Sequence, residues 1–324
     1  MQVTIADFKH LPARCRFIAL MPQWDFLNFL SEHAARFPGF ALKMQTEVTG
    51  LVQQSGRVIG VYAKTPDRAI EARADLVVGA DGRNSVVRER AALKVKDLGA
   101  PMDVLWFRLT RTPEDPAATM GRFDAGRIFI MINRGEYWQC GYVIAKGRFE
   151  QMRRQSVETF RSEIKRLAPF AKEKVGEMRT WDDVKLLTVR VDRLLQWYRP
   201  GLLCLGDAAH AMSPVGGGIN LAIQDAVAAG NVLFKPLIEG RVTIADLRRI
   251  QRRRELPTSI TQWLQVTVQR RIIARILDET APLNPPLAAR LLARFPCLRR
   301  IPARIVGLGI RPEHVDPEIV PLGL

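Results

Sequence analysis

The stretch GDAAHAMSPVGGGINLAIQDA, residues 206–226, limits the fold of this chain more than any other segment. An apolar run at 202–206, typical of a buried strand, ends at the acidic Asp207. Three adjacent glycines follow at 216–218, and a helix of about 20 residues is expected from Ile219. Glycine lets a backbone approach a ligand because no Cβ stands in the way. The pattern therefore predicts a strand, a tight turn and a helix N-terminus at one place.

The residue types in this stretch indicate what such a site could bind. Asp207 offers only hydrogen-bond acceptors, so it can hold sugar-type hydroxyls. The helix N-terminus behind the glycines presents unpaired N–H groups and a partial positive charge, which suit an anion or the carbonyl edge of a planar ring. The spacing indicates a polyol clamp followed by a cradle for a ring edge. A glycine-rich connection without any ligand is the alternative.

A second signature is DLVVGADGRNSVVR, residues 75–88. It predicts a buried strand at 75–80, a turn at Asp81-Gly82, and a helix capped by Asn84 or Ser85. An Asp-Gly turn alone is common and says little about function. The whole string, and its position before the glycine-rich stretch, make this signature informative.

Together the two stretches resemble the GD and DG motifs of the flavoprotein hydroxylases, the family of para-hydroxybenzoate hydroxylase. The GD match consists of Gly206, Asp207, His210, Pro214, Gly216, Gly218, Asn220, Asp225 and Ala226. The separation of the motifs also resembles the family, which carries a β-rich substrate domain between them.

This resemblance implies an α/β fold, in which a glutathione-reductase-like FAD-binding domain is interrupted by a β-sheet substrate domain and followed by a helical C-terminus. It implies FAD as cofactor, NAD(P)H as co-substrate, and use of O₂ to hydroxylate or epoxidise an aromatic or apolar small molecule. The protein supplies position and electrostatics, while the flavin supplies the chemistry. Another flavin reaction on the same scaffold, such as that of a prenyl-type reductase, and a truncated non-catalytic remnant are the alternatives.

The resemblance also assigns residues. Asp207 is expected on the ribityl chain, Pro214 and the 216–218 backbone beside the isoalloxazine, and the Asp81 turn near the pyrophosphate. Gln23 stands where the family usually has an arginine, and Val48 where a strand passes the adenine, although a plain core role would also explain both. The expected FAD contacts are Gln23, Val48, Asp81, Gly82, Arg83, Gly206, Asp207, Pro214, Gly216, Gly217, Gly218, Ile219 and Asn220. His210 is expected to pack or hydrogen-bond near the flavin, and no catalytic residue is assigned.

The sequence departs from the family at one point. The family opens with a strand, a G-x-G-x-x-G turn and a helix that bind the ADP part of FAD, and this string is absent here. Met1 aligns with the family's interior, so the N-terminal βαβ unit is expected to be missing. We therefore expect residues 1–324 to hold FAD poorly or not at all, because the diphosphate would lack its backbone cradle.

The predicted domains are a discontinuous FAD-binding domain at 1–100 and 200–240, a β-rich substrate domain at 101–199, and a helical region at 241–324. A helix is expected from Pro22 through Phe37, and a hairpin turn at Ser55-Gly56. A further helix is expected at 156–168. The predicted strands are 15–21, 40–53, 57–64, 69–73, 75–80, 103–110, 126–133, 136–145, 184–191 and 202–206.

The net charge and the cysteine content limit the kinds of partner that the chain is expected to bind. The chain has 49 Lys+Arg against 33 Asp+Glu, a formal charge of +16, much of it after residue 240 and including Arg248, Arg249, Arg252, Arg253 and Arg254. Solvated helix faces explain this charge without a partner. No nucleic-acid motif accompanies it, so we expect no nucleic acid, and weak association with a membrane surface stays open. Four cysteines without a C-x-x-C pair predict free thiols, no metal site and a cytoplasmic location.

Overall fold

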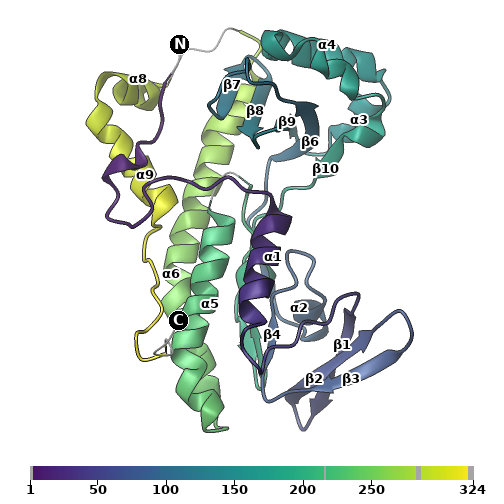
Figure 1. Ribbon diagram of the computed structural model, residues 1–324, viewed down its shortest axis with the longest axis vertical. Helices are drawn as coiled ribbons and strands as arrows, with labels where there is room; N and C mark the ends of the chain where they lie inside the picture. The colour runs from purple at the N-terminus through teal and green to yellow at the C-terminus, as the bar shows by residue number, and fades with distance from the viewer. Residues whose placement is uncertain (1–2, 215–216, 282–285, 320–324) are drawn as a thin grey trace. The chain divides into compact units, whose positions relative to one another are not determined.

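The computed structural model describes residues 3–214, 217–281 and 286–319 (Figure 1). The chain forms two compact units. We call Met1–Ala41, Ala100–Val189 and Val266–Arg300 the sheet unit, and Leu42–Gly99, Arg190–Gln265 and Ile301–Leu324 the motif unit. The predicted domain ranges divide the chain differently, since 1–41 groups here with the middle sheet, and they stay a prediction about functional domains.

The sheet unit is built on one five-stranded antiparallel sheet. Its strands in spatial order are β10 (Lys185–Leu187), β6 (Met102–Thr110), β9 (Tyr137–Ala145), β8 (Arg127–Asn133) and β7 (Met120–Asp124). The strands predicted at 103–110, 126–133 and 136–145 are confirmed. The strand predicted at 184–191 is only three residues long, because the backbone N–H of Val189 donates to the Asp103 carboxylate (3.0 Å) instead of to a neighbouring strand.

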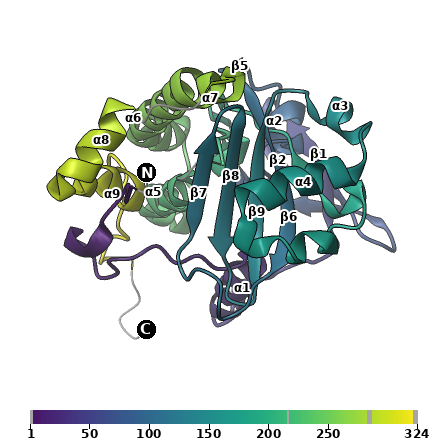
Figure 2. The ribbon, with the colours of Figure 1, turned by 90° about the horizontal axis from the view of Figure 1, so that it is seen from above.

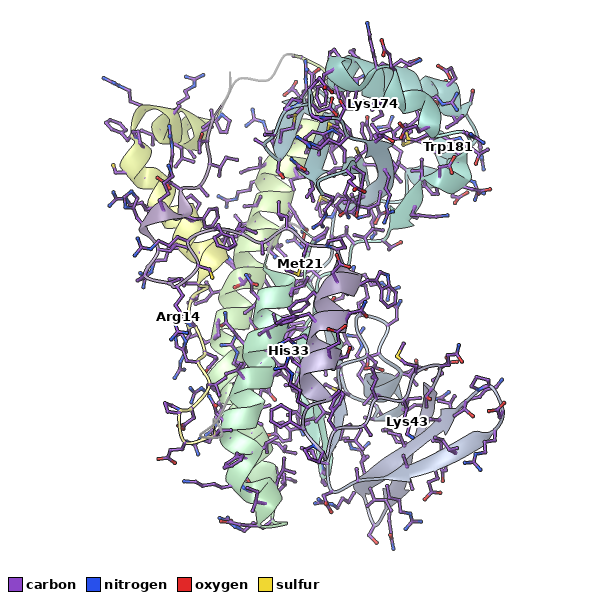
Figure 3. All side chains as sticks on the ribbon, in the orientation of Figure 1. Arg14, Met21, His33, Lys43, Lys174 and Trp181 are labelled. Carbon is purple, nitrogen blue, oxygen red and sulfur yellow. The ribbon has the colours of Figure 1, made fainter. Side chains whose placement is uncertain are left out.

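Alternation along the strands places a core on each face of this sheet. Leu105, Phe107 and Leu109 point to one face, where α4 (Val157–Leu167) covers them with Phe160 and Ile164 (Figure 2). Lys174 and Trp181, labelled in Figure 3, come from the turns after α4. The Trp181 ring stacks on Phe160 at 5.4 Å, and Lys174 Nζ lies 2.5 Å from the Asp115 carboxylate.

The second face of the sheet is covered by the segment after α6 (Ile244–Val268). Met102, Val104 and Ile128 form a cluster with Ile273, and Ile276 packs against it. These last two residues come from a π-helical turn (Gln269–Ile273) and from α7 (Ala274–Asp278). The sheet unit also contains α1 (Gln23–Ala34), α3 (Phe149–Arg153) and α8 (Leu287–Arg294).

The strand predicted at 15–21 is wrong. These residues form no strand and are exposed, with Phe17 at 66%. A strand requires a paired backbone, and no described strand lies alongside this segment. The hydrogen bond recorded for it is from Arg134 Nη1 to the carbonyl of Met21 (2.7 Å; Met21 is labelled in Figure 3). An apolar run alone therefore does not define a strand.

The motif unit contains three small sheets. An antiparallel meander consists of β1 (Glu47–Gln54), β2 (Arg57–Lys64) and β3 (Ala69–Arg73), and Ser55-Gly56 forms the predicted hairpin turn. The other pairings are β5 (Val95–Asp97) with β11 (Asp192–Leu194), and β12 (Tyr198–Arg199) with β13 (Leu202–Cys204) and β4 (Val77–Gly79). The strands predicted at 57–64 and 69–73 are confirmed, and those at 75–80 and 202–206 are confirmed with shorter bounds.

Two long helices, α5 (Gly218–Ile238) and α6 (Ile244–Val268), lie side by side in both views (Figures 1 and 2). The unit also contains α2 (Val86–Arg90) and most of α9 (Arg300–Gly307). By length and composition α5 could cross a membrane. Its fully buried Asp225 and its Ala228, Ala229, Val232 and Leu233 in the core identify it as a core helix of this unit.

Candidate functional site

The two predicted motifs meet because β4 and β13 pair in parallel, with Val77 opposite Leu202 and Gly79 opposite Cys204. The carboxyl ends of parallel strands lie at one edge of a sheet, and ligands of α/β proteins bind at such edges. The Asp81-Gly82 turn follows β4, and Gly206 with Asp207 follows β13. We call this place the motif edge.

An ion pair across the motif edge joins the two motifs. Arg83 Nη2 donates to Asp207 Oδ2 at 3.3 Å, and both side chains are partly exposed (28% and 29%). Among the described residues, Asp207 Oδ1 accepts no hydrogen bond, and Arg83 Nη1 is buried without a partner. The edge thus offers a free carboxylate oxygen beside unused guanidinium donors, which suits a hydroxylated chain ending in a phosphate.

The helix behind this edge begins where the glycines predict it. Gly217 caps α5 with φ of +98°, and its carbonyl accepts from Leu221 N–H at 3.0 Å. Space is open around Gly217, since a Cβ there would meet no heavy atom within 4 Å. Pro214 and Ile219 are exposed, Ile219 to 61%. The predicted contact Gly216 lies outside the described residues.

The left-handed conformation makes a testable distinction between neighbouring glycines. Gly217→Ala should lower the free energy of unfolding by roughly 1–2 kcal/mol, because an L-residue is strained there. Gly218→Ala is the matched control: its Cβ would meet Met212 Cβ at 3.4 Å, an ordinary contact, and alanine favours the helix. Urea titration of both variants measures the difference. Equal losses would contradict the assignment of the strained position to Gly217.

Gly206 is fixed by packing as well as by conformation. Its φ is +56°, and a Cβ would come within 2.9 Å of the Ala222 side chain on α5. Its N–H donates to Asp225 Oδ2 at 3.2 Å. The strand therefore ends tightly against α5, and this places Asp207 at the motif edge.

The DG turn uses its polar side chains to hold its own helix. Asp81 Oδ2 accepts from Val87 N–H (3.0 Å), and Ser85 Oγ accepts from Arg88 N–H (2.9 Å), so Ser85 is the predicted cap of α2. Gly82 has φ of +81°. The Asp81 carboxylate thus has a structural role here, while its predicted place near a pyrophosphate stays a prediction.

Sequence reasoning missed the ion pair between Arg88 and Asp192. The guanidinium donates to both carboxylate oxygens (3.0 and 3.2 Å) and to the carbonyl of Arg83 (2.6 Å). Asp192 Oδ1 also accepts from Ala211 N–H at 3.4 Å. This buried pair therefore ties the segment after the DG turn to the segment after Asp207. The arginine in the DG string was the only local signal for it.

A second buried network lies beneath the GD turn. Asp225 accepts from Arg254 Nε (2.9 Å), and its other oxygen lies 2.5 Å from His210 Nε2. Arg254 also donates to Gln224 Oε1 and to the carbonyl of Arg311. The sequence grouped Arg254 with solvated helix faces, which is wrong, because its side chain is fully buried. Its periodic surroundings on a polar helix gave no sign of the buried partner.

His210 is enclosed by this network. Its ring lies 4.9 Å from the Trp197 ring, and its side chain is 1% exposed. Nδ1 is buried without a partner among the described residues. A packing role for His210 is consistent with these contacts.

Three other predicted contacts are Gln23, Val48 and Asn220. Gln23 is the exposed first residue of α1 and belongs to the sheet unit. Val48 is half-buried in β1 and packs against the core of the motif unit. Asn220 is exposed and donates to the carbonyl of Val306 at 3.3 Å. The structure thus brings together Asp81, Gly82, Arg83, Gly206, Asp207, Gly217 and Gly218.

The thiol next to the motif edge is not a nucleophile. Burial and the nearby Asp81 carboxylate raise the pKa of Cys204 to about 12, so it stays protonated at neutral pH. All four cysteines are free, as predicted. Within the described ranges, no cluster of His, Cys, Asp and Glu has the arrangement of a metal site.

Comparison with known proteins agrees with this geometry. A family model described as FAD binding domain matches residues 3–262. The 6-methylpretetramide 4-monooxygenase of Streptomyces rimosus is 31% identical over 302 residues, which cover 92% of this chain and 72% of that protein. The digeranylgeranylglycerophospholipid reductase of Methanocella arvoryzae is 26% identical over 227 residues, covering 68% of this chain and 55% of that protein.

Among solved structures, the OxyS anhydrotetracycline hydroxylase from Streptomyces rimosus matches with a TM-score of 0.67 and 21% identity, covering 96% of this chain and 61% of that one. This likeness confirms the predicted α/β fold class. The chain spans 55–72% of the length of these three proteins.

Proposed function

Because the chain belongs to the FAD-binding-domain family of flavoprotein monooxygenases, we propose that it holds FAD at the motif edge and oxidises an aromatic or apolar small molecule. NAD(P)H as reductant and O₂ as oxidant complete the proposed reaction. The substrate class is drawn from the relatives, which include a 6-methylpretetramide 4-monooxygenase and an anhydrotetracycline hydroxylase.

The observation that carries the proposal is the pairing of Asp207 with Arg83 in front of the α5 N-terminus. FAD fits this arrangement in three respects. Among the described residues, Asp207 Oδ1 accepts no hydrogen bond and is open for a ribityl hydroxyl, Arg83 Nη1 is buried and unpartnered, and no side chain fills the space at Gly217. The fit does not extend to the diphosphate cradle, since no G-x-G-x-x-G occurs in the sequence.

The bound flavin would supply the redox chemistry between the nicotinamide and oxygen. The chain's own residues bind and orient. Asp207 would fix the ribityl chain, and Arg83 would balance negative charge on the phosphate side. The N–H groups at the α5 N-terminus would face the ring edge and would favour negative charge there.

The reaction can be tested with the chain supplied with excess FAD and NADPH or NADH. We expect a phenolic polyketide substrate to gain one labelled oxygen atom when the gas phase is ¹⁸O₂, with reductant consumed in step. The reductase alternative, raised by the Methanocella arvoryzae relative, predicts saturation of a prenyl chain under anaerobic conditions. Label from water instead of O₂, or turnover that needs no O₂, would overturn the monooxygenase proposal.

A further inference from the structure

The segment between Glu279 and Glu313 carries six arginines and no acidic residue. It contains α8 and α9, which the turn Pro296–Arg299 joins. Backbone carbonyls of this segment accept from Asn220 and Arg254, but none of its arginine side chains is used in the motif edge or in the proposed oxidation. Its charge therefore asks for a separate explanation.

The first helix, α8, mixes exposed leucines with arginines. Leu287 and Leu291 are four positions apart, and Arg290 and Arg294 stand at the third and seventh positions after Leu287. At 100° per residue these four side chains fall within about a third of the helix circumference. Leu287 is 72% exposed and Leu291 39%, so the leucines do not face a core.

The second helix, α9, repeats the pattern. Ile301, Arg304 and Ile305 have the spacing of Leu287, Arg290 and Leu291 in α8. Ile301 is 59% exposed, whereas Ala303 on the opposite side is fully buried. The buried alanine anchors the helix, while the isoleucines and the arginine stay at the surface. Each helix thus exposes a narrow face that is both apolar and cationic.

The arginines of these faces are not engaged by the protein. In the part of the chain that the structure describes, Arg290, Arg294 and Arg304 form no ion pair, unlike Arg88 and Arg254 in the motif unit. Arg294 lies 6.0 Å from the Phe295 ring, itself 49% exposed. The aliphatic part of an arginine side chain can lie along an apolar surface while the guanidinium stays in water. These side chains therefore suit an interface between an apolar phase and water.

We propose that the exposed faces of α8, in the sheet unit, and of α9, in the motif unit, each dock on an anionic lipid bilayer. The charge favours anionic headgroups, and the leucine and isoleucine side chains enter the acyl boundary, as in amphipathic interfacial helices. Nucleic acid would match the arginines but not the exposed aliphatic side chains. A second copy of the chain would place like charges against each other.

The test is flotation of the full chain with lipid vesicles on a density gradient, in which aggregated protein stays at the bottom. Vesicles of phosphatidylglycerol and phosphatidylcholine in equal parts should carry the protein upward, and pure phosphatidylcholine should not. A triple variant should partition onto the anionic vesicles about 100-fold less than the parent chain, at about fivefold for each arginine. Its substitutions are Arg290→Gln, Arg294→Gln and Arg304→Gln. Added salt should weaken binding.

The aliphatic side chains give the discriminating variant. Leu287→Ser with Leu291→Ser should lower partitioning by at least about tenfold, because two exposed leucines no longer enter the bilayer. Arg249→Gln with Arg252→Gln, exposed arginines of α6, is the matched charge control and should bind nearly as the parent chain does. Circular dichroism confirms that each variant folds.

Either of two results would overturn the proposal. Flotation of the serine variant equal to that of the parent chain would reduce the binding to a simple charge effect. Alternatively, a polynucleotide could displace the chain from vesicles while binding the parent and the serine variant equally, which would identify nucleic acid as the partner. Because no flavin is involved, failure here leaves the proposed oxidation untouched.

Discussion

Arg254→Met should lower the free energy of unfolding by about 3–5 kcal/mol, because it leaves a charge uncompensated in the core. Arg254 and Asp225 are both fully buried, and their side chains meet at 2.9 Å. Without the guanidinium, the Asp225 carboxylate keeps only the Gly206 N–H and His210 as partners. The carbonyl of Arg311 and Gln224 lose their donor as well.

The measurement is a urea titration followed by circular dichroism. Arg252→Met, on the exposed side of the same helix, is the matched control and should change stability by no more than about 0.5 kcal/mol. Combining Arg254→Met with Asp225→Asn should cost less than the sum of the single losses, because the unpaired charge is removed. A loss below about 1 kcal/mol in Arg254→Met would show that water reaches this pair.

Local signals were sufficient to predict β6, β8 and β9, the three central strands of the sheet unit. In β6, Leu105, Phe107 and Leu109 alternate with side chains of the opposite face. This period of two residues is typical of a β-strand. The turn at Ser55-Gly56 likewise lies between two β-rich runs. In β7 most side chains are exposed, so no alternation marked it and it was missed.

Pairing over long distances was not predictable from the residues alone. The apolar segment at 15–21 has the composition of a strand but no described partner, and it is exposed. The parallel pairing of β4 with β13, which creates the motif edge, was not predicted from the sequence. Nothing in either short strand specifies the other.

The buried polar stripe of α6 shows why the second network escaped prediction. Gln262 Nε2 donates to the carbonyls of Asp192 and Ala211 (2.7 and 3.2 Å), and Gln265 Oε1 accepts from Ser213 N–H (3.1 Å). Polar residues at helical spacing normally indicate a solvated face. Here they form hydrogen bonds with backbone groups of the segment that follows Asp207. That segment lies more than 50 residues earlier in the chain.

Asp207→Ala should weaken flavin binding about 10- to 150-fold, the effect of losing one charge-assisted hydrogen bond worth roughly 1.5–3 kcal/mol. The structure supports a direct contact, since Arg83 engages only Oδ2 and leaves Oδ1 open beside the α5 N-terminus. The proposed contact is with the ribityl chain. FMN is therefore the sharper probe, because it contains the ring, the ribityl chain and one phosphate but no adenosine diphosphate.

Quenching of FMN fluorescence by increasing protein concentration gives the dissociation constant even when binding is weak. Asp207→Asn should fall between the parent and Asp207→Ala, because the amide oxygen still accepts a hydrogen bond but carries no charge. Asp67→Ala, an exposed carboxylate between β2 and β3, is the control and should bind as the parent does. Arg83→Gln separates the ion pair from the ligand contact: if it weakened FMN binding as much as Asp207→Ala, while Asp207→Asn matched the parent, the carboxylate would serve only to hold the guanidinium. Unchanged affinity in Asp207→Ala would move the flavin away from the motif edge.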